Sequence, residues 1–511
     1  MSFSFGNRED AAAAHVLAIP YPTQGHINPM LRFTTQLAEK GIRVSFICYE
    51  DSIPDLRSSS GATDAPSSLQ TSNFQFVTVQ RRSVHATVNV LRSPFEPIME
   101  KLTRDKNAGV AGRPTCIISD MFLPWTCDVA ETLQIPRYML VPGGAIFARY
   151  LQGSLFYFDR GQFQFSKMDG KLVEFDWPLC IPGLPPLKFH ELNDLLRNFT
   201  SDFREVAESI VKSAGVLVNS FLELEEKVVE AFRNPENSAG EGDYRPIKVP
   251  KIYPVGPLFS TTAITHVNNV YALEDSSSRC LNWLDARPSS SVLYIAFGSA
   301  VRLRPEQIQE LAYGLEASKQ RFLWVCPLKK IGSTEESPIS ITEALPPNFE
   351  DRVRDRGRIV TGWAPQLQIL AHSSTGGFFT HCGWNSSLES IIFGVPMIGW
   401  PQGAEQHLNC KFMINELKVA EQIQAGKEND IVKRDEVERA VRFLMEDSQG
   451  ATIRRRAEEL QRTATAAMTE GGSQSKNFRE FLDDIRSPQV SLNSEMNKLD
   501  IMSPKSQWVI D

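Results

Sequence analysis

The sequence predicts an α/β protein made of two Rossmann-like, doubly wound halves joined by a linker. Short apolar segments alternate with longer helical patterns both before residue 234 and after residue 278. Strand, crossover helix and strand in succession are typical of a parallel sheet with helices on both faces. The segment between the halves is rich in Pro, Gly, Ser, Thr and Asn, which is typical of a linker. A length of 511 residues is enough for two domains.

The first half begins with an apolar strand at residues 15–20, followed by a turn at Gly25. Asn28 and Pro29 predict the start of a helix, because proline is tolerated in the first helical turn. Gly41 predicts its end. Further strands are predicted at 43–49, 115–120 and 216–220, with a helical stretch running to residue 133.

The second half repeats this alternation. Strands are predicted at 291–297 and 321–326 with a helix at 305–318 between them, and similar pairs continue to residue 417. Two helical stretches follow, at about 433–446 and 450–486. The polar residues 487–511 predict a poorly ordered tail. No sequence repeat relates the two halves.

The composition excludes several classes of protein. With 54 Lys and Arg against 61 Asp and Glu, the net charge of −7 argues against a nucleic-acid partner. No run of about 18 apolar residues occurs, so no integral membrane association is expected. The eight cysteines are scattered and form no Cys-x-x-Cys pair, which argues against a disulfide framework or a zinc site. We therefore expect a cytoplasmic protein.

One segment, from Trp363 to Gln406, contains most of the chemistry. Residues 376–381 form a predicted strand, and residues 382–386 turn into a helix that continues to 393. The free N–H groups and positive potential of a helix N-terminus suit a phosphate group. Side chains able to donate hydrogen bonds lie at that end, namely His381, Asn385 and Ser386. Glu389 lies one turn further on, where a carboxylate could accept from both ribose hydroxyls.

Two other parts of this segment suit the rest of a nucleotide sugar. Trp363 offers a flat face on which a base could stack. Glu405 and Gln406 follow a strand at 395–400, at the sheet edge where open α/β sheets bind ligands. The sequence contains no G-x-x-x-x-G-K-[ST], no G-x-G-x-x-G after a strand and no Asp-x-Asp triplet. A diphosphate site without a metal ion or other cofactor is the remaining interpretation.

This 44-residue segment, with HCGWNS and the closing Glu-Gln, resembles the signature box of plant-type UDP-sugar-dependent (family 1) glycosyltransferases. Supporting resemblances lie around Gly25-His26, Ser119-Asp120, Trp283-Leu284-Asp285 and Phe297-Gly298-Ser299. The resemblance implies the GT-B architecture, in which two Rossmann-like domains face each other across a cleft. It implies an acceptor-binding domain at 1–255, a linker at 256–280 and a UDP-sugar-binding domain at 281–470. Residues 471–486 would form a helix returning to the first domain, ahead of the tail at 487–511.

The resemblance also implies a role for each donor-site residue. Trp363 would stack on uracil, with the backbone of Ala364 at the base edge, and Gln366 and Glu389 would hold the ribose. The remaining residues would bind the diphosphate (Ser299, His381, Asn385 and Ser386) or the sugar (Trp384, Glu405 and Gln406). Gln406 resembles the residue found in glucose-using members, so UDP-glucose is the expected donor. A different UDP-sugar with the same chemistry is an alternative.

The catalytic expectation concerns His26 and Asp120. A position near a helix N-terminus should favour the neutral imidazole that a general base requires. The resemblance makes His26 the base that removes the proton of an acceptor hydroxyl, with Asp120 orienting the ring. Attack from the face opposite UDP would then give an inverted, β-linked glycoside. A non-catalytic UDP-sugar binder would need neither residue, which argues against that alternative.

Simpler interpretations compete at several positions. Trp363 and Trp384 could be core aromatics, Asp120 a helix cap and Glu389 a surface residue. Two interpretations, core packing and an aromatic acceptor pocket, apply equally to a group of seven aromatic residues. These are Phe147, Tyr150, Phe156, Tyr157, Phe158, Phe163 and Phe165. The expected acceptor is a small lipophilic molecule with a hydroxyl group, such as a flavonoid, another phenolic or a terpenoid. We expect a monomer.

Overall fold

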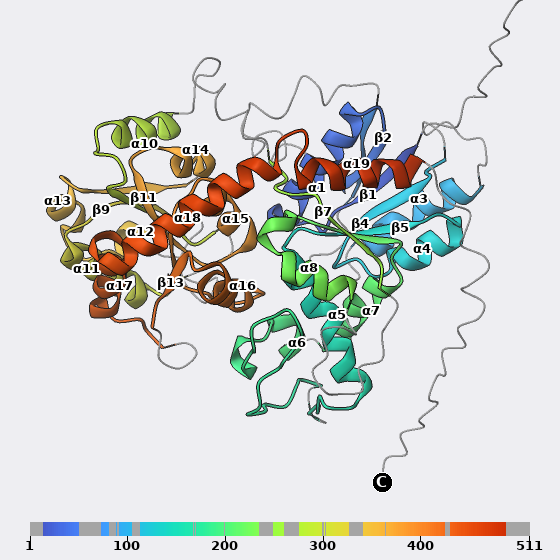
Figure 1. Cartoon of the computed structure of the whole chain (residues 1–511), viewed down its shortest axis with the longest axis horizontal. Coiled ribbons are helices and arrows are strands. Elements are labelled where there is room, and N and C mark those ends of the chain that lie inside the picture. Colours follow the sequence, from blue (N-terminus) through green and yellow to red (C-terminus); the bar gives the residue numbers. More distant parts are fainter. Residues whose placement is uncertain are drawn as a thin grey trace, which may run out of the picture.

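A computed structural model describes residues 14–50, 73–80, 88, 91–104, 113–166, 168, 170–198, 200–234, 249–259, 275–298, 301, 303–326, 341–362, 364–424 and 430–486. Within these residues the chain forms two parallel sheets, with helices against them (Figure 1). This is the α/β architecture that the alternation of apolar and helical segments predicts.

The first sheet has seven strands in the order β3-β2-β1-β4-β5-β6-β7, and every neighbouring pair is parallel. Its strands are β1 (His15–Ile19), β2 (Arg43–Tyr49), β3 (Phe74–Val79), β4 (Cys116–Asp120), β5 (Arg137–Val141), β6 (Gly215–Val218) and β7 (Lys251–Pro254). The topology switches at β1, because β2 and β3 lie on one side of it and β4 to β7 on the other. Ligands bind at such a point in open α/β sheets, outside the carboxyl ends of the strands.

The second sheet has six parallel strands in the order β10-β9-β8-β11-β12-β13. Its strands are β8 (Val292–Ala296), β9 (Arg321–Cys326), β10 (Gly357–Thr361), β11 (Thr375–Thr380), β12 (Met397–Gly399) and β13 (Ala420–Gln422). The strands that follow β8 in sequence are added on one side of it up to β10, and on the other side from β11 onwards, so the topology switches between β8 and β11. The two sheets therefore share one topological plan although their sequences show no repeat.

Helices cover both sheets. Those of the first part are α1 (Gln24–Glu39), α3 (Arg92–Arg104), α4 (Thr126–Leu133), α5 (Ala145–Asp159), α6 (Asp194–Asn198), α7 (Thr200–Val211) and α8 (Glu226–Arg233). Those of the second part are α10 (Asp275–Asp285), α11 (Pro305–Ser318), α12 (Ile341–Ala344), α13 (Phe349–Val353), α14 (Gln366–Ala371), α15 (Trp384–Ile392), α16 (Gln406–Phe412), α17 (Arg434–Glu446), α18 (Ser448–Ala467) and α19 (Ser473–Arg486). Shorter helical turns are η3 (Phe189–Glu191), η4 (Leu222–Leu224) and η7 (Met413–Leu417).

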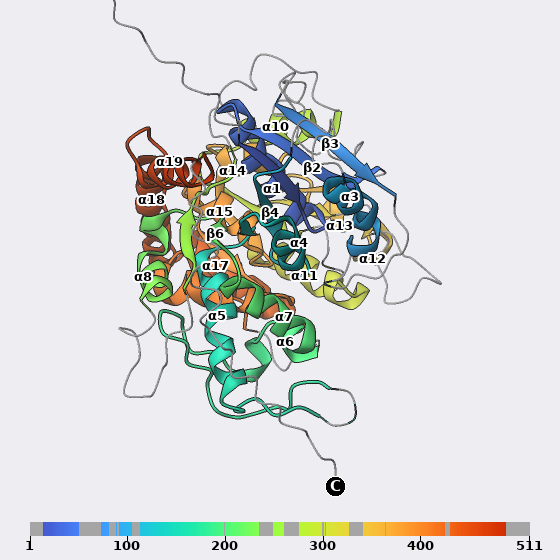
Figure 2. The same cartoon turned by 90° about the vertical axis from the view of Figure 1, so that its right-hand side faces the viewer.

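The last helix, α19, crosses from the second sheet to the first. In Figure 1 it follows α18 and lies near α1 and strand β7, and Figure 2 shows it next to α18. Phe481 packs against Tyr138 and Tyr253 of the sheet and against Phe33 of α1. Asn477 donates a hydrogen bond to the carbonyl oxygen of Pro254 at 3.1 Å. The apolar face of the first sheet is thus covered by a helix from the far end of the sequence.

Three predicted boundaries are wrong. Helix α1 begins at Gln24, so Pro29 lies inside it rather than in its first turn. The Pro- and Gly-rich segment at 234–278 contains a strand, β7, because its short apolar run pairs with β6. The helical stretch at 450–486 is two helices, since the chain turns at Gly471 and Gly472.

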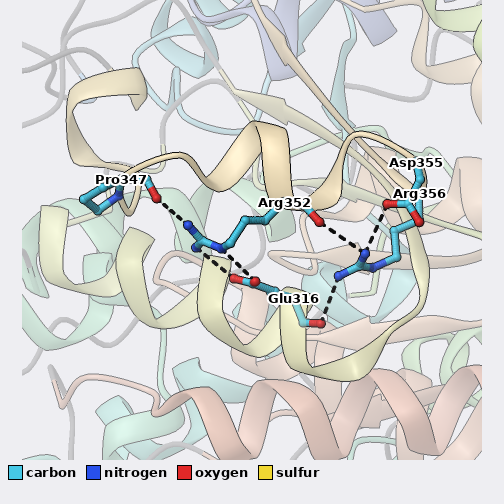
Figure 3. A network of polar contacts seen from close by, with 5 residues as sticks. All are labelled: Glu316, Pro347, Arg352, Asp355 and Arg356. Atoms are coloured by element: carbon cyan, nitrogen blue, oxygen red, sulfur yellow. Dashed lines mark hydrogen bonds and ion pairs between the residues drawn. The ribbon is translucent and has the colours of Figure 1, made fainter.

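A network of charged side chains near the surface connects helices α11 and α13 beside the second sheet (Figure 3). Arg352 of α13 binds both carboxylate oxygens of Glu316 of α11, at 2.8 and 2.9 Å, and also donates to the carbonyl oxygen of Pro347. Arg356 donates to the backbone oxygens of Glu316 and Arg352 at 3.3 and 3.4 Å. Because the carboxylate accepts from Arg352, the pKa of Glu316 lies below its usual value. The network joins α11 to α13.

Among the helices in the described part of the chain, none has the length and apolar character needed to cross a membrane. The predicted tail at 487–511 lies outside the described residues.

Candidate active site

The carboxyl ends of β1 and β4 bring His26 and Asp120 together. The two strands are parallel neighbours, with Ile19 opposite Ser119, so the residues that follow them meet at one sheet edge. His26 Nδ1 lies 2.8 Å from Asp120 Oδ2. The other carboxylate oxygen, Oδ1, accepts from the backbone N–H of Phe122 at 2.9 Å, which fixes the carboxylate. With Nδ1 facing Asp120, Nε2 is the nitrogen available to receive a proton.

Two aromatic rings flank this imidazole. The ring centroids of Tyr21 and Phe122 lie 5.4 and 5.2 Å from that of His26, and 5.5 Å from each other. Both rings are partly exposed. Asp120 is fully buried, whereas the His26 side chain keeps 17% of its surface exposed. His26 is therefore accessible on one side, beside apolar surface.

The pKa of His26 shifts in the opposite direction to the expected bias towards the neutral ring. Burial lowers this pKa, but the charge of Asp120, the hydrogen bond to Asp120 and the charge of Glu405 raise it by more, so the net direction is upward. A carboxylate in direct contact favours the protonated imidazole. The sequence pattern does not indicate how close these two side chains lie.

The N-terminus of α15 forms the second part of the site. His381 follows β11, Gly298 follows the neighbouring strand β8, and the ring packs close to Gly298 and Gly383. A Cβ atom on either glycine would lie 2.7 or 2.5 Å from His381 Nε2, so a larger residue would displace the ring. Burial lowers the pKa of His381 to about 4. Its Nδ1 is shut off from solvent and has no hydrogen-bond partner among the described residues. This lowered pKa favours the neutral imidazole, which can form hydrogen bonds.

Gln366 and Glu389, the pair expected at the ribose, lie in contact. Gln366 Nε2 donates to Glu389 Oε2 at 2.7 Å and to Ser386 Oγ at 3.0 Å, and its Oε1 accepts from the hydroxyl of Tyr294 at 3.2 Å. Burial raises the pKa of Glu389, although the hydrogen bond from Gln366 and the charge of Arg32 lower it in part. Ala364, two residues before Gln366, is also buried. These side chains form one polar cluster beside the α15 N-terminus.

Asn385 connects the two halves. Its Nδ2 donates to the carbonyl oxygen of Gly25 at 3.0 Å, and its Oδ1 accepts from Asn219 Nδ2 at 3.0 Å. Gly25 immediately precedes His26, so the turn expected to bind the diphosphate contacts the turn that carries His26.

Trp384 is buried where the two halves of the molecule meet. Its indole is 3% exposed, and its Nε1 donates to the backbone oxygen of Asn219 at 2.7 Å. The ring fills the space above Gly144, where a Cβ atom would lie 2.5 Å from it. The indole of Trp384 therefore contributes to the contact between the halves, and its role at the sugar stays a prediction.

Glu405 and Gln406 lie at the start of α16. Gln406 Oε1 accepts from the backbone N–H groups of Gln402 and Gly403, at 2.8 and 3.2 Å, which leaves its amide nitrogen for other partners. Glu405 Oε1 accepts from Asn409 Nδ2 at 3.3 Å. Both residues are partly exposed. Trp363 and Ser299 lie outside the described residues, and their roles stay predictions.

Asn219 is the residue that the sequence analysis did not identify. It follows β6, is 3% exposed and contacts three parts of the chain. Its Oδ1 accepts from the backbone N–H of Leu258 at 2.9 Å, and its Nδ2 donates to Asn385. The one available indication was a polar residue at the carboxyl end of a predicted strand, where α/β sheets place functional groups.

The aromatic-rich stretch at 147–165 is mainly packed into the core. Four of its seven aromatic residues are buried, namely Phe147, Tyr150, Phe158 and Phe163. Tyr157 is partly buried and stacks on Trp177 with a centroid distance of 5.8 Å. Phe165 is 41% exposed. Core packing is therefore the correct interpretation for the four buried rings.

Within the part of the chain that the structure describes, no group of three or more His, Cys, Asp or Glu side chains is placed to hold a metal ion. The positive potential available to a diphosphate comes from the N-terminus of α15.

Comparisons with known proteins agree with this arrangement. A family model described as "UDP-glucoronosyl and UDP-glucosyl transferase" matches residues 247–450, and one described as "Glycosyltransferase, N-terminal domain" matches residues 12–101. Cinnamate beta-D-glucosyltransferase of Fragaria ananassa is 32% identical, covering 97% of this chain and 87% of that protein. UDP-glycosyltransferase 72B2 of Arabidopsis thaliana is 34% identical, covering 95% and 99% respectively.

Solved structures show the same fold. UGT2 of Phytolacca americana, in complex with UDP-2fluoro-glucose and pterostilbene, is similar to this chain with a TM-score of 0.75 and 29% sequence identity. The likeness covers 93% of this chain and 100% of that one.

Proposed function

The chain belongs to the family of UDP-glucoronosyl and UDP-glucosyl transferases, and on that premise we propose that it glucosylates a hydroxyl group of a small lipophilic molecule. As a UDP-glycosyltransferase of GT-B fold, it transfers a sugar from a UDP-sugar to a small acceptor. The proposal adds UDP-glucose as donor, a flavonoid, other phenolic or terpenoid as acceptor, and inversion at the anomeric carbon. It also adds His26 as the base.

The observation that carries this proposal is the 2.8 Å contact between His26 and Asp120, beside the N-terminus of α15. In the proposed reaction His26 Nε2 takes the proton of the acceptor hydroxyl as its oxygen attacks the anomeric carbon. The bond between that carbon and UDP breaks on the opposite face, and UDP leaves. Asp120 stabilises the imidazolium that forms. The partly exposed rings of Tyr21 and Phe122 support a flat, apolar acceptor next to the base.

The donor is proposed to lie along the second sheet. Uracil would stack on Trp363 near Ala364, and the ribose would bind Gln366 and Glu389. Ser299, His381, Asn385 and Ser386 would hold the diphosphate, with Glu405 and Gln406 at the glucose. Neutral donors and the helix terminus supply the favourable potential, so the proposed reaction needs no metal ion. Activity should then persist in EDTA.

The test is a UDP-release assay with UDP-glucose and a panel of phenolics and terpenoid alcohols, run beside the variant His26→Ala. We expect release that requires an acceptor and falls by roughly 10²- to 10⁴-fold in the variant, with UDP binding nearly unchanged by calorimetry. Loss of UDP binding together with transfer would contradict the assigned role of His26. UDP-glucose binding without release for any acceptor would favour a non-catalytic binder.

The panel should include cinnamate and gallate, because relatives are named for these two acids. A carboxylate is already ionised at neutral pH and needs no base to attack. Transfer to such acids should therefore survive His26→Ala better than transfer to phenols or alcohols. Equal losses for both classes would show that His26 does more than remove a proton.

A further inference from the structure

Three hydrogen bonds run in one direction from the linker to the turn that carries His26. The backbone N–H of Leu258 donates to Asn219 Oδ1 at 2.9 Å, and Asn219 Nδ2 donates to Asn385 Oδ1 at 3.0 Å. Asn385 Nδ2 then donates to the carbonyl oxygen of Gly25 at 3.0 Å. The chain thus links the linker, the end of β6, the N-terminus of α15 and the start of α1.

The direction of this chain is fixed by its two ends. A backbone N–H can only donate, and a backbone carbonyl can only accept. The two asparagine amides between Leu258 and Gly25 therefore have a single orientation in which all three bonds form. The backbone oxygen of Asn219 also accepts from Trp384 Nε1 at 2.7 Å, so Asn219 holds α15 at two points.

Pro29 makes the carbonyl oxygen of Gly25 available. In an α-helix the carbonyl of residue i accepts from the N–H of residue i+4, and the residue four positions after Gly25 is Pro29, which has no N–H. A proline inside α1 therefore leaves Gly25 without its regular helical donor. Asn385, from the other half of the molecule, donates to that oxygen instead.

We propose that Asn219 is a positioning residue for glycosyl transfer, because it holds the N-terminus of α15 against the turn that carries His26. It touches no reacting atom and acts through Asn385 and Trp384. The distance between the donor diphosphate at α15 and the base on α1 is then set by neutral amide groups. This inference rests on the proposed function, since it assigns His26 and the α15 N-terminus to the two reactants.

The test uses the variants Asn219→Asp and Asn219→Ser in the full chain. In Asn219→Asp the side chain still accepts from Leu258 but cannot donate, so Asn385 either loses this bond or turns its oxygen towards Gly25. Asn219→Ser removes the hydrogen bond to Asn385 without adding a charge. It replaces Asn219→Asp in the test if the buried carboxylate of that variant prevents folding. We expect kcat to fall by about 10- to 100-fold, with the KM for UDP-glucose within about threefold.

The matched control is Lys411→Met. Lys411 of α16 also joins the two halves, through Glu191 at 2.7 Å and the carbonyl oxygen of Pro186 at 2.9 Å, but it has no contact with the amide chain. We expect its kcat to stay within about twofold of the unmodified protein. The proposal is overturned if a folded Asn219 variant keeps its kcat, or if Lys411→Met lowers kcat to the same extent.

A second readout needs no turnover. UDP bound at α15 should slow hydrogen exchange in the peptide spanning residues 24–31, and this effect should be lost in Asn219→Ser while UDP still binds. A protein that binds UDP but transfers no sugar would refute the proposed function and still test the amide chain. If UDP slows hydrogen exchange in residues 24–31 of Asn219→Ser as much as in the unmodified protein, the proposed role of Asn219 is overturned.

Discussion

Two strand-to-helix turns meet where the halves of the molecule join, and each carries a histidine in a different environment. His26 lies after β1 with its Nδ1 on Asp120, and its pKa is raised above the ordinary value. His381 lies after β11 between two glycines, with no carboxylate bonded to it among the residues that the structure describes, and its pKa is lowered to about 4. These opposite shifts fit the roles proposed above, a proton acceptor in one turn and a neutral hydrogen-bonding group in the other. The neighbouring carboxylate makes the difference.

The largest expected effect comes from removing that carboxylate. Asp120→Asn keeps the shape of the side chain but removes its charge, which makes the surroundings of His26 resemble those of His381. We expect kcat for a phenolic acceptor to fall by roughly 10²-fold or more, because the imidazolium formed during transfer loses its partner. The exposed Asp128→Asn is the control and should be unaffected. A decrease of less than about threefold would contradict the orienting role.

The next effect concerns the donor. His381→Ala removes a hydrogen-bond donor from the proposed diphosphate site, so the KM for UDP-glucose should rise by roughly 10- to 100-fold with a smaller change in kcat. Steady-state kinetics and UDP calorimetry would measure it. His372→Gln, just beyond the end of α14, should leave both values nearly unchanged. A variant that loses kcat and keeps its KM would assign His381 to the chemical step instead.

The pH dependence separates the two histidines. Transfer needs neutral His26, whose raised pKa lies above its ordinary value of 6.5, so kcat/KM should fall as pH drops through that range. The decrease should approach tenfold per pH unit, and the midpoint should move to lower pH in Asp120→Asn. His381 changes charge only near pH 4 and should add no second step above pH 5. An acid limb with its midpoint below pH 6 in the unmodified protein would contradict the assignment.

The smallest effect is on stability in acid. A group with a lowered pKa in the folded state binds its proton more readily when unfolded, so His381 costs stability as pH falls from about 6.5 towards 4. Between pH 7 and 4.5 the free energy of unfolding should therefore decrease by roughly 1–2 kcal/mol less in His381→Ala than in the unmodified protein. His26 has the opposite effect on the free energy of unfolding. Because its pKa is raised in the folded state, it adds stability at low pH, and this stability is lost as pH rises through the pKa of the folded state. Identical pH dependence of thermal unfolding would show that His381 is not protected from protonation.

The local pattern predicted both turns but not what joins them. Strand, turn and helix around His26 and His381 follow from apolar runs and glycine positions. The family resemblance assigned Gln366 and Glu389 to one ribose, and these two side chains lie in contact. The bond between Asn219 and Asn385 joins residues 166 positions apart, and no local pattern indicates such a contact. The same holds for the indole of Trp384, whose burial depends on Gly144 of the other half. The raised pKa of His26 was missed because it depends on the 2.8 Å distance between its Nδ1 and Asp120 Oδ2, which lie 94 positions apart in the sequence.

The return of α19 to the first sheet has a consequence for building chimeras from this protein and its relatives. The part that folds around the first sheet is not one continuous stretch, because it combines β1 to β7 with residues 473–486. A single crossover in the linker would exchange α19 together with the second sheet, and place a foreign helix on Tyr138, Tyr253 and Phe33. Two crossovers, one in the linker and one at Gly472, would leave that apolar face with its own helix while the second sheet and its helices are replaced.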